Sequence, residues 1–179
     1  RAGYHMEGAD LSAAMLTKAD RLAREEGLRI PFFLADASAL KAPKQYDFIL
    51  SPNDCFNYIP QKKLPAAFAR VAKALKKGGI FWFDVSSSYK LRHKVADNIS
   101  ADDREDVTYL SFNSLAKDRV EMDVTLFVKR KDGAFDRFDE HHTQYIHEEE
   151  DLSAALSGAG FSLIRAEGHL GEHKEGSDR

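Results

Sequence analysis

Acidic side chains stand at two positions where an apolar stretch gives way to a polar turn. Asp10 follows Gly8-Ala9 and precedes Ser12, which begins a segment with helical spacing, and Asp36 follows the apolar residues 30–35. An ionised carboxyl offers two acceptor oxygens, which match the paired hydroxyls of a ribose. A carboxylate at the junction of a parallel strand and a helix is therefore suited to hold a ribose.

A third polar group follows another apolar stretch. Ser51 comes after residues 46–50 and begins the loop Pro52-Asn53-Asp54-Cys55-Phe56-Asn57-Tyr58. Ligands of open α/β sheets bind beyond the carboxyl ends of the strands, so we expect Asp10, Asp36 and residues 51–54 to meet at one edge of a sheet. Cys55 has no base nearby in the sequence, and we interpret it as a small buried residue.

The segments that must position these side chains alternate between strands and helices. Strand patterns are expected at residues 4–9, 30–35, 48–51 and 80–85. Helical spacing follows the Ser12 cap as far as Gly27, and recurs over residues 62–77 until Gly78-Gly79. This alternation predicts an α/β fold with an open, mostly parallel sheet and helices on both faces.

The pattern changes after residue 85. Residues 88–98 are expected to be helical and residues 100–106 to form an acidic loop. Three strand-like stretches follow, at residues 107–115, 119–130 and 135–146, and the middle one alternates apolar and polar side chains. A period of two predicts an antiparallel strand with one wet face, so we expect an antiparallel β insert over residues 107–147. A helix over residues 148–157 and a strand over residues 162–166 then return to the α/β pattern.

Composition limits the classes of protein that the chain can represent. Its 26 basic and 29 acidic residues give a net charge of −3, whereas nucleic-acid binders usually carry a basic surplus. The single cysteine, Cys55, leaves no internal disulfide and fits a reducing compartment, so the cytoplasm is the expected location. No apolar stretch has the length of a membrane span. His141 and His142 are adjacent and would point to opposite faces of a strand, so we predict no metal site.

The order and spacing of these elements resemble those of the class I S-adenosylmethionine-dependent methyltransferases, from about Gly3 to about Phe161. The resemblance implies a Rossmann-like fold, methyltransferase activity and S-adenosylmethionine as the cofactor. It places Asp10, with its neighbour Leu11, at the ribose. It also places the Asp36 carboxylate at the adenine amino group and the Ala37 N–H at a ring nitrogen.

The resemblance also implies where the methyl acceptor binds. Ser51 and Asn53 would lie at the methionine end of the cofactor. Acceptor contacts are expected from Asp54, Tyr58, His142 and Tyr145, with His142 as a candidate base. Methyl transfer depends mainly on positioning and needs a base only where the acceptor must lose a proton, so the sequence identifies no catalytic residue. The segment Ser-Pro-Asn-Asp-Cys lacks the Asn-Pro-Pro-Tyr pattern of many enzymes that methylate base or glutamine nitrogens.

One part of the family pattern has no counterpart in this chain. The glycine-rich loop should precede the first helix, and Arg1-Ala2-Gly3 instead resembles the end of an earlier helix. We therefore expect residues 1–179 to be one methyltransferase-like domain that is truncated at its N-terminus. The strand that would then be absent is a central one, which would leave its two neighbours with unpaired backbone groups.

Two alternatives to methyl transfer stay open at the level of sequence. A nicotinamide-dependent oxidoreductase also uses an acid after its second strand, and an upstream Gly-x-Gly-x-x-Gly segment would favour it. A non-catalytic methyltransferase-like domain that binds a partner would be favoured by bulky residues in place of the glycines. Among acceptors, the charge favours a small molecule and leaves RNA open, and oligomeric state is left undetermined.

Overall fold

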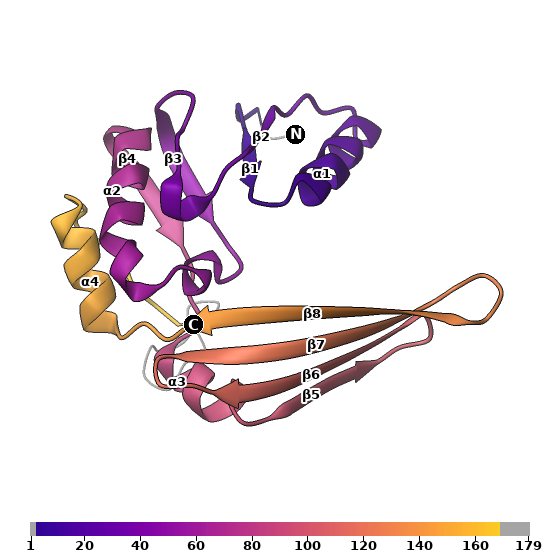
Figure 1. Ribbon diagram of the computed structural model, residues 1–179. Coiled ribbons are helices and arrows are strands. Elements are labelled where there is room, and N and C mark those ends of the chain that lie inside the picture. The colour runs from indigo at the N-terminus through magenta and orange to yellow at the C-terminus, as the bar shows by residue number, and fades with distance from the viewer. Residues whose placement is uncertain (1–2, 169–179) are drawn as a thin grey trace.

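The computed structural model describes residues 3–168 and divides into an α/β part and a four-stranded antiparallel sheet (Figure 1). The α/β part contains β1 (Gly8–Asp10), α1 (Ala13–Glu25), β2 (Phe32–Leu34), β3 (Tyr46–Ser51), α2 (Leu64–Ala74), β4 (Leu75–Phe83) and α4 (Glu149–Gly158). The antiparallel sheet contains β5 (Ile99–Asp103), β6 (Val107–Leu115), β7 (Arg119–Lys129) and β8 (Phe135–Tyr145). None of the helices in the described range is long and apolar enough to cross a membrane.

The first unit is a parallel pair of short strands joined by α1. β1 and β2 pair in the register Gly8↔Phe32 to Asp10↔Leu34. The Ser12 hydroxyl accepts a hydrogen bond from the Met15 N–H at 3.3 Å, which caps α1 as expected. Gly27 follows the end of the helix with φ +70°, a conformation that glycine adopts without steric cost.

The main hydrophobic core lies between the β3–β4 pair and two helices. Phe56 and Phe68 are 1% and 0% exposed and their rings stack at 4.8 Å. Phe81 and Phe83 of β4 pack against these rings, and the α4 residues Leu152, Ala155 and Leu156 belong to the same cluster. The expected helix is therefore present as α4, and α2 and α4 cover the same face of the β3–β4 pair (Figure 1).

The expected parallel strands are present in the described chain, but they do not pair into one sheet. β1–β2 and β3–β4 form two separate two-stranded parallel sheets, and no strand of residues 3–168 lies hydrogen-bonded between β1 and β3. Helices on both faces were also expected, but Phe48, Leu50, Ile80 and Trp82 on the second face of β3–β4 are each about half exposed. The apolar pattern of a strand reports which side chains can be buried, not whether a neighbouring strand is there to bury them.

Glu7 links the two parallel sheets. The Tyr46 hydroxyl donates to its Oε2 at 2.5 Å, and Lys44 Nζ lies 2.6 Å from Oε1. Both partners lower the pKa of Glu7, with Lys44 as the larger cause, whereas burial and the Glu7 carboxylate raise the pKa of Tyr46 to about 12. At neutral pH, Glu7 therefore stays ionised and Tyr46 stays protonated, which is the pairing that the hydrogen bond requires.

Several element boundaries in the α/β part differ from the sequence prediction. The helix expected as far as residue 77 ends at Ala74, and β4 begins at Leu75 with a register shift between Tyr46↔Leu75 and Phe48↔Ile80. Gly78, at φ +78°, lies within β4 at this irregularity in the strand pairing, so it does not end the helix as expected. The first two strands are also shorter than expected, and residues 162–166 form no strand because they have no pairing partner among the described residues.

The antiparallel sheet has one more strand than expected. Residues 100–106 were predicted to be a loop, but β5 pairs with β6 from Ile99↔Phe112 to Asp103↔Thr108. The edge of β6 offers backbone partners that outweigh the low strand propensity of the acidic residues. The segment before it is only partly helical, with the short α3 (Ser88–Lys90) followed by one π-helical turn, Leu91–Val95.

The two faces of the antiparallel sheet differ as the alternation of β7 predicts. The inner face carries Val120, Met122 and Val124 of β7 and Glu140, His142 and Gln144 of β8, and the outer face carries Glu121, Asp123 and Thr125 with Asp139, His141 and Thr143. Val120 is fully buried against Leu91, Ala96 and Ile146. The inner face therefore joins the sheet to the rest of the molecule.

We expect Phe68→Ala to lower the free energy of unfolding by about 3–5 kcal/mol, because it empties a fully buried aromatic position. Phe112→Ala is the matched control, since that ring is 50% exposed and should cost far less. Urea unfolding followed by circular dichroism measures both. Equal losses in the two variants would contradict this account of the core.

Candidate active site

The two carboxylates predicted to bind a ribose and an adenine lie at neighbouring strand ends. Asp10 is the last residue of β1, and its Oδ1 accepts a hydrogen bond from the Ser12 N–H at 2.8 Å. Asp36 follows β2, and its Oδ1 accepts from the Ser38 N–H at 2.7 Å. Because β1 and β2 are parallel and adjacent, both carboxylates stand at the same edge. Each uses one oxygen to order its own turn, which leaves the other oxygen for a ligand.

The neighbours of these carboxylates differ in exposure. Leu11 is 71% exposed directly after Asp10. Ala37 begins the 3₁₀ turn Ala37–Ala39 and packs partly against the main core, which fixes the backbone beside Asp36. The Leu11 side chain is therefore accessible to a nucleoside. At Ala37, the predicted contact would be made by the backbone N–H, whose position is fixed.

Hydrogen bonds join the ends of β3 and β4 into one rigid edge. The Asp84 N–H donates to the Ser51 carbonyl at 3.3 Å, and the Asp54 N–H donates to Asp84 Oδ1 at 3.0 Å. The Ser86 hydroxyl donates to Asp54 Oδ2 at 2.9 Å. These contacts bring together the predicted residues Ser51 and Asp54 with Asp84 and Ser86, which follow β4.

The loop after β3 is held in a costly backbone conformation. Asn53 and Asp54 have φ values of 63° and 55°, in the left-handed region that side chains other than glycine seldom adopt. Each such residue costs about 1–2 kcal/mol, and the bonds from Asp84 and Ser86 to Asp54 offset part of it. Asn and Asp adopt this conformation more readily than other residues with a side chain, and the ends of both strands hold the loop in it.

Asn57 joins three segments of the candidate site, and no role there was predicted for it from the sequence. It is fully buried, its Oδ1 accepts from the Ser86 N–H at 2.8 Å, and its Nδ2 donates to the carbonyls of Ser86 at 3.2 Å and Tyr145 at 3.0 Å. One amide thus joins the loop after β3, the segment after β4 and the end of β8. In the sequence, the feature that could have indicated this role is an amide side chain placed between two aromatic residues, Phe56 and Tyr58.

His147 supports the same junction from the far side. The side chain is 3% exposed, and its Nε2 lies 3.0 Å from the Phe56 carbonyl, to which it donates. Burial lowers the pKa of His147, so the ring is neutral at physiological pH. It connects the segment that leads from β8 into α4 with the 3₁₀ turn Cys55–Tyr58.

The charges of the carboxylates at the strand ends all act on Cys55. Burial is the main cause that raises the pKa of its thiol, and the charges of Asp10, Asp36 and Asp84 raise it further, whereas a hydrogen bond with Ser51 lowers it. The side chain is half-buried. A thiol with a raised pKa is a poor nucleophile at neutral pH, so Cys55 serves as part of the packing.

The predicted acceptor residues are divided between two faces of the antiparallel sheet. Tyr58 lies over the inner face, where its hydroxyl is bonded to Gln144 and its ring meets the His142 ring edge-on at 6.2 Å. Burial raises the pKa of Tyr58. The Tyr145 side chain lies on the outer face, because residues adjacent along a strand alternate, and Tyr145 meets the site only through its carbonyl.

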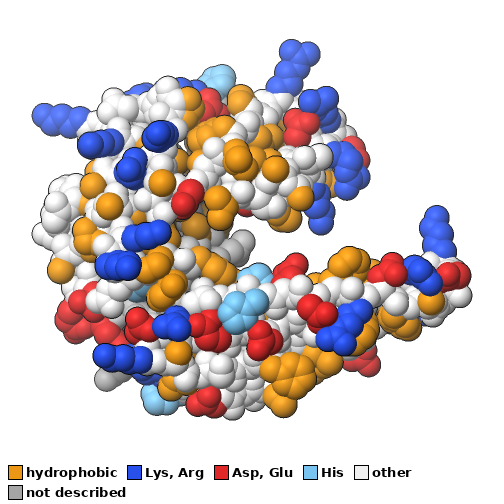
Figure 2. All heavy atoms as spheres, in the orientation of Figure 1, with side chains coloured by type: hydrophobic (Ala, Val, Ile, Leu, Met, Phe, Trp, Pro, Cys, Tyr) orange, Lys and Arg blue, Asp and Glu red, His pale blue; other side chains and the backbone are white. Residues whose placement is uncertain are grey.

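A hollow separates the N-terminal part of the molecule from the antiparallel sheet, between α1 and β8 (Figure 2). β1 and α1 lie on one side of this space and β8 lies on the other (Figure 1).

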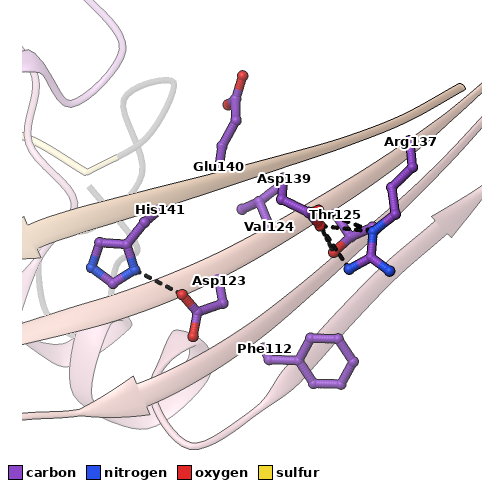
Figure 3. Close-up of a pocket in the computed structure, with 8 residues that line it drawn as sticks. All are labelled: Phe112, Asp123, Val124, Thr125, Arg137, Asp139, Glu140 and His141. Atoms are coloured by element: carbon purple, nitrogen blue, oxygen red, sulfur yellow. Dashed lines mark hydrogen bonds and ion pairs between the residues drawn. The ribbon is translucent and has the colours of Figure 1, made fainter.

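A different depression, of about 440 Å³, lies on the outer face (Figure 3). His141 Nδ1 meets Asp123 Oδ1 at 2.7 Å there, and Arg137 is bonded to Asp139. Glu140 points away from this group toward the inner face (Figure 3). The charged side chains of the depression are paired with one another, and within residues 3–168 no group of His, Cys, Asp or Glu side chains could hold a metal ion. We therefore place the active site at the strand ends and not here.

Comparisons with known proteins bear on the family of the chain. Residues 1–79 match the family described as "Methyltransferase domain". The chain is 32% identical over 167 residues to "Putative methyltransferase YqeM" of Bacillus subtilis (strain 168), which covers 91% of this chain and 67% of that protein.

Solved structures show the same fold. An S-adenosylmethionine-dependent methyltransferase from Clostridium acetobutylicum ATCC 824 superposes with a TM-score of 0.91 at 29% identity, over 98% of this chain and 72% of that one. The sugar N-methyltransferase KedS8 from Streptoalloteichus sp. ATCC 53650 gives a TM-score of 0.70 at 21% identity, over 86% and 62% of the two chains, and shows a shared fold. These likenesses favour methyl transfer over the oxidoreductase and partner-binding alternatives.

We expect Asn57→Ala to lower the free energy of unfolding by at least about 2 kcal/mol, because it leaves three buried backbone groups without their partner. Asn98→Ala is the control, since Asn98 also bonds to backbone groups but is exposed to water, which replaces the lost bonds. Urea unfolding of both variants measures the difference. A loss at position 57 no greater than at position 98 would contradict the central role of Asn57.

Stability should depend on pH through His147. Its pKa in the folded protein lies below the unfolded value of about 6.5, so the unfolded chain binds the proton more tightly and stability falls as pH drops below that value. In His147→Gln, whose amide can still donate to the Phe56 carbonyl, this part of the pH dependence should vanish. Thermal unfolding at pH 7.5 and 5.5 measures it, and equal changes in melting temperature for both proteins would refute the assignment.

Proposed function

The chain belongs to the class I S-adenosylmethionine-dependent methyltransferases, and we propose that it methylates a small-molecule acceptor bound between the strand ends and the antiparallel sheet. The observation that carries this proposal is the position of three carboxylates at the carboxyl ends of parallel strands: Asp10 ends β1, Asp36 follows β2 and Asp84 follows β4. The charges of all three act on Cys55. The carboxyl ends of parallel strands are where open α/β sheets bind their ligands.

The side chains at this edge have the chemistry that S-adenosylmethionine requires. We assign the ribose hydroxyls to Asp10, beside Leu11, and the adenine to Asp36 and the Ala37 N–H. Ser51 and Asn53 are assigned to the methionine end. In support, Asp10 and Asp36 each engage one oxygen with a local N–H and keep the second for a ligand. Bound S-adenosylmethionine supplies a methyl group on a positively charged sulfur, and a cluster of carboxylates favours that charge.

The acceptor is assigned to the space beside Asp54, Tyr58 and His142, without Tyr145, whose side chain lies on the outer face. Residues 107–147 would then roof the acceptor within a single domain that spans residues 1–179. A net charge of −3 and the acidic strand ends favour a small acceptor over a polyanion such as RNA. The same fold serves a sugar N-methyltransferase in KedS8, which is consistent with an acceptor of that size.

The protein itself has two tasks in methyl transfer. It holds the acceptor in line with the methyl group and keeps water out of the space between them. The hydrogen-bonded edge formed by Ser51, Asp54 and Asp84 suits this task, because these bonds already order its backbone and the Asp84 carboxylate. No reorganisation of these groups is then needed when the ligands bind.

We expect Asp10→Asn to weaken S-adenosylmethionine binding by about tenfold to a hundredfold, the range for losing a hydrogen bond to a charged group. Asparagine keeps the Oδ1 atom that accepts from the Ser12 N–H and replaces only the second oxygen. Asp20→Asn is the matched control, because Asp20 lies on α1 in an ion pair with Arg24. Titration calorimetry measures all three proteins. A well-folded Asp10→Asn protein that binds as tightly as the control would refute the assignment.

The acceptor class is tested by incubating the protein with S-adenosylmethionine and either a panel of sugars, amines and phenols or total RNA. Formation of S-adenosylhomocysteine with the panel alone supports a small acceptor. Turnover with RNA alone would overturn it.

A further inference from the structure

Glu140, His142 and Gln144 lie in a row on the inner face of β8. Successive side chains on a strand alternate, so these three share the face that meets Tyr58. Directly opposite His142, β7 contributes the uncharged Met122. The charged and titratable groups around the His142 ring are therefore Glu140 on its own strand and Tyr58 on the facing turn, with Tyr109 and Asp54 acting on Tyr58.

The contact with Glu140 determines which nitrogen of the neutral His142 ring is basic. Glu140 Oε2 lies 2.9 Å from His142 Nε2. A carboxylate can only accept, so Nε2 carries the hydrogen and Nδ1 keeps its lone pair. No hydrogen bond to Nδ1 is formed within the described part of the chain. His142 thus has an oriented ring with one unoccupied basic nitrogen, the arrangement that a general base requires.

Tyr58 places this ring next to the proposed active site. It is the last residue of the turn Cys55–Tyr58, which begins directly after Asp54, and the Asp54 charge acts on its hydroxyl. Its hydroxyl is held by Gln144 and its ring borders His142. The structure therefore connects the end of β3 to His142 through one aromatic side chain.

We infer that Nδ1 of His142 accepts a proton from the methyl acceptor, whose nucleophile is therefore a hydroxyl or an ammonium group, and that Glu140 is the positioning residue. This inference rests on the proposed function. The N–H or O–H bond of the acceptor breaks and its proton goes to Nδ1. The freed lone pair forms the bond to the methyl carbon, and the carbon–sulfur bond breaks with its electron pair on sulfur. Water then takes the proton from the imidazolium.

His141, the next residue on the same strand, provides the matched control. Both of its ring nitrogens are engaged, Nδ1 with Asp123 at 2.7 Å and Nε2 with Glu121 at 3.1 Å, and it lies on the outer face. Asp123 is the main cause that raises the pKa of His141, which favours the charged ring. A charged histidine with both nitrogens occupied cannot accept a proton, although it differs from His142 by one position.

The first experiment uses the protein without any acceptor. Long-range ¹H–¹⁵N correlation spectra at pH 8 report which nitrogen of each histidine carries hydrogen. We expect the Nε2–H form for His142, and a mixture of both forms in Glu140→Ala. An Nδ1–H form in the wild type, or an unchanged spectrum in Glu140→Ala, would overturn the inference.

The second experiment measures methyl transfer from S-adenosylmethionine to a panel of hydroxyl compounds and amines as a function of pH. His142→Gln should lower kcat by about 10²–10⁴-fold at pH 7, and the loss should shrink as rising pH deprotonates the acceptor. Glu140→Ala should show a smaller loss of the same kind, and His141→Gln none. A His142→Gln protein with the wild-type rate and pH profile would contradict the inference.

Calorimetry with S-adenosylmethionine separates failure of this inference from failure of the proposed function. The cofactor should bind His142→Gln as tightly as the wild type. If the wild type does not bind it, the proposed function fails. If the wild type binds it but methylates none of the hydroxyl and amine compounds, the acceptor class inferred from His142 is wrong.

Discussion

The buried side chain of Asn57 joins the three segments from which the active site is built. Its amide oxygen and nitrogen satisfy backbone groups of Ser86 and Tyr145, so the loop after β3, the segment after β4 and the end of β8 share one residue. An amide is suited to this because it both donates and accepts, whereas an apolar residue would leave buried backbone groups unpaired. Ser86, which also bonds to Asp54, and the end of β8 are therefore both held by this contact.

The position of the antiparallel sheet follows from this junction. His147 bonds to the Phe56 carbonyl beside Asn57, and Val120 packs against Leu91 and Ile146 at the root of the sheet. The remainder of β7 and β8 extends away from these contacts (Figure 1). Only the root of the sheet is held by the core, so its inner face meets Tyr58 near the strand ends. This is the geometry that an acceptor site between the two parts needs.

The positions of the carboxylates in the fold could be predicted from sequence because strand ends are local features. Asp10 and Asp36 stand where an apolar stretch stops, and in a parallel arrangement such positions share an edge. The role of Asn57 could not be predicted, because its three partners lie 29 and 88 positions away along the chain. β5 was missed for a related reason, since Asp102 and Asp103 become a strand only when the edge of β6 is available.

The sequence alone determined the α/β class, the helix begun by Ser12, the alternation of β7 and the carboxylates at the strand ends. Each of these depends on residues within a few positions of one another, through capping, periodicity or turn chemistry. Only the tertiary structure decided that the parallel strands form two separate pairs, that Tyr145 faces away from His142, and that Glu140 orients the His142 ring. Those outcomes depend on which segments meet and through which face, and that is set by packing between distant parts of the chain.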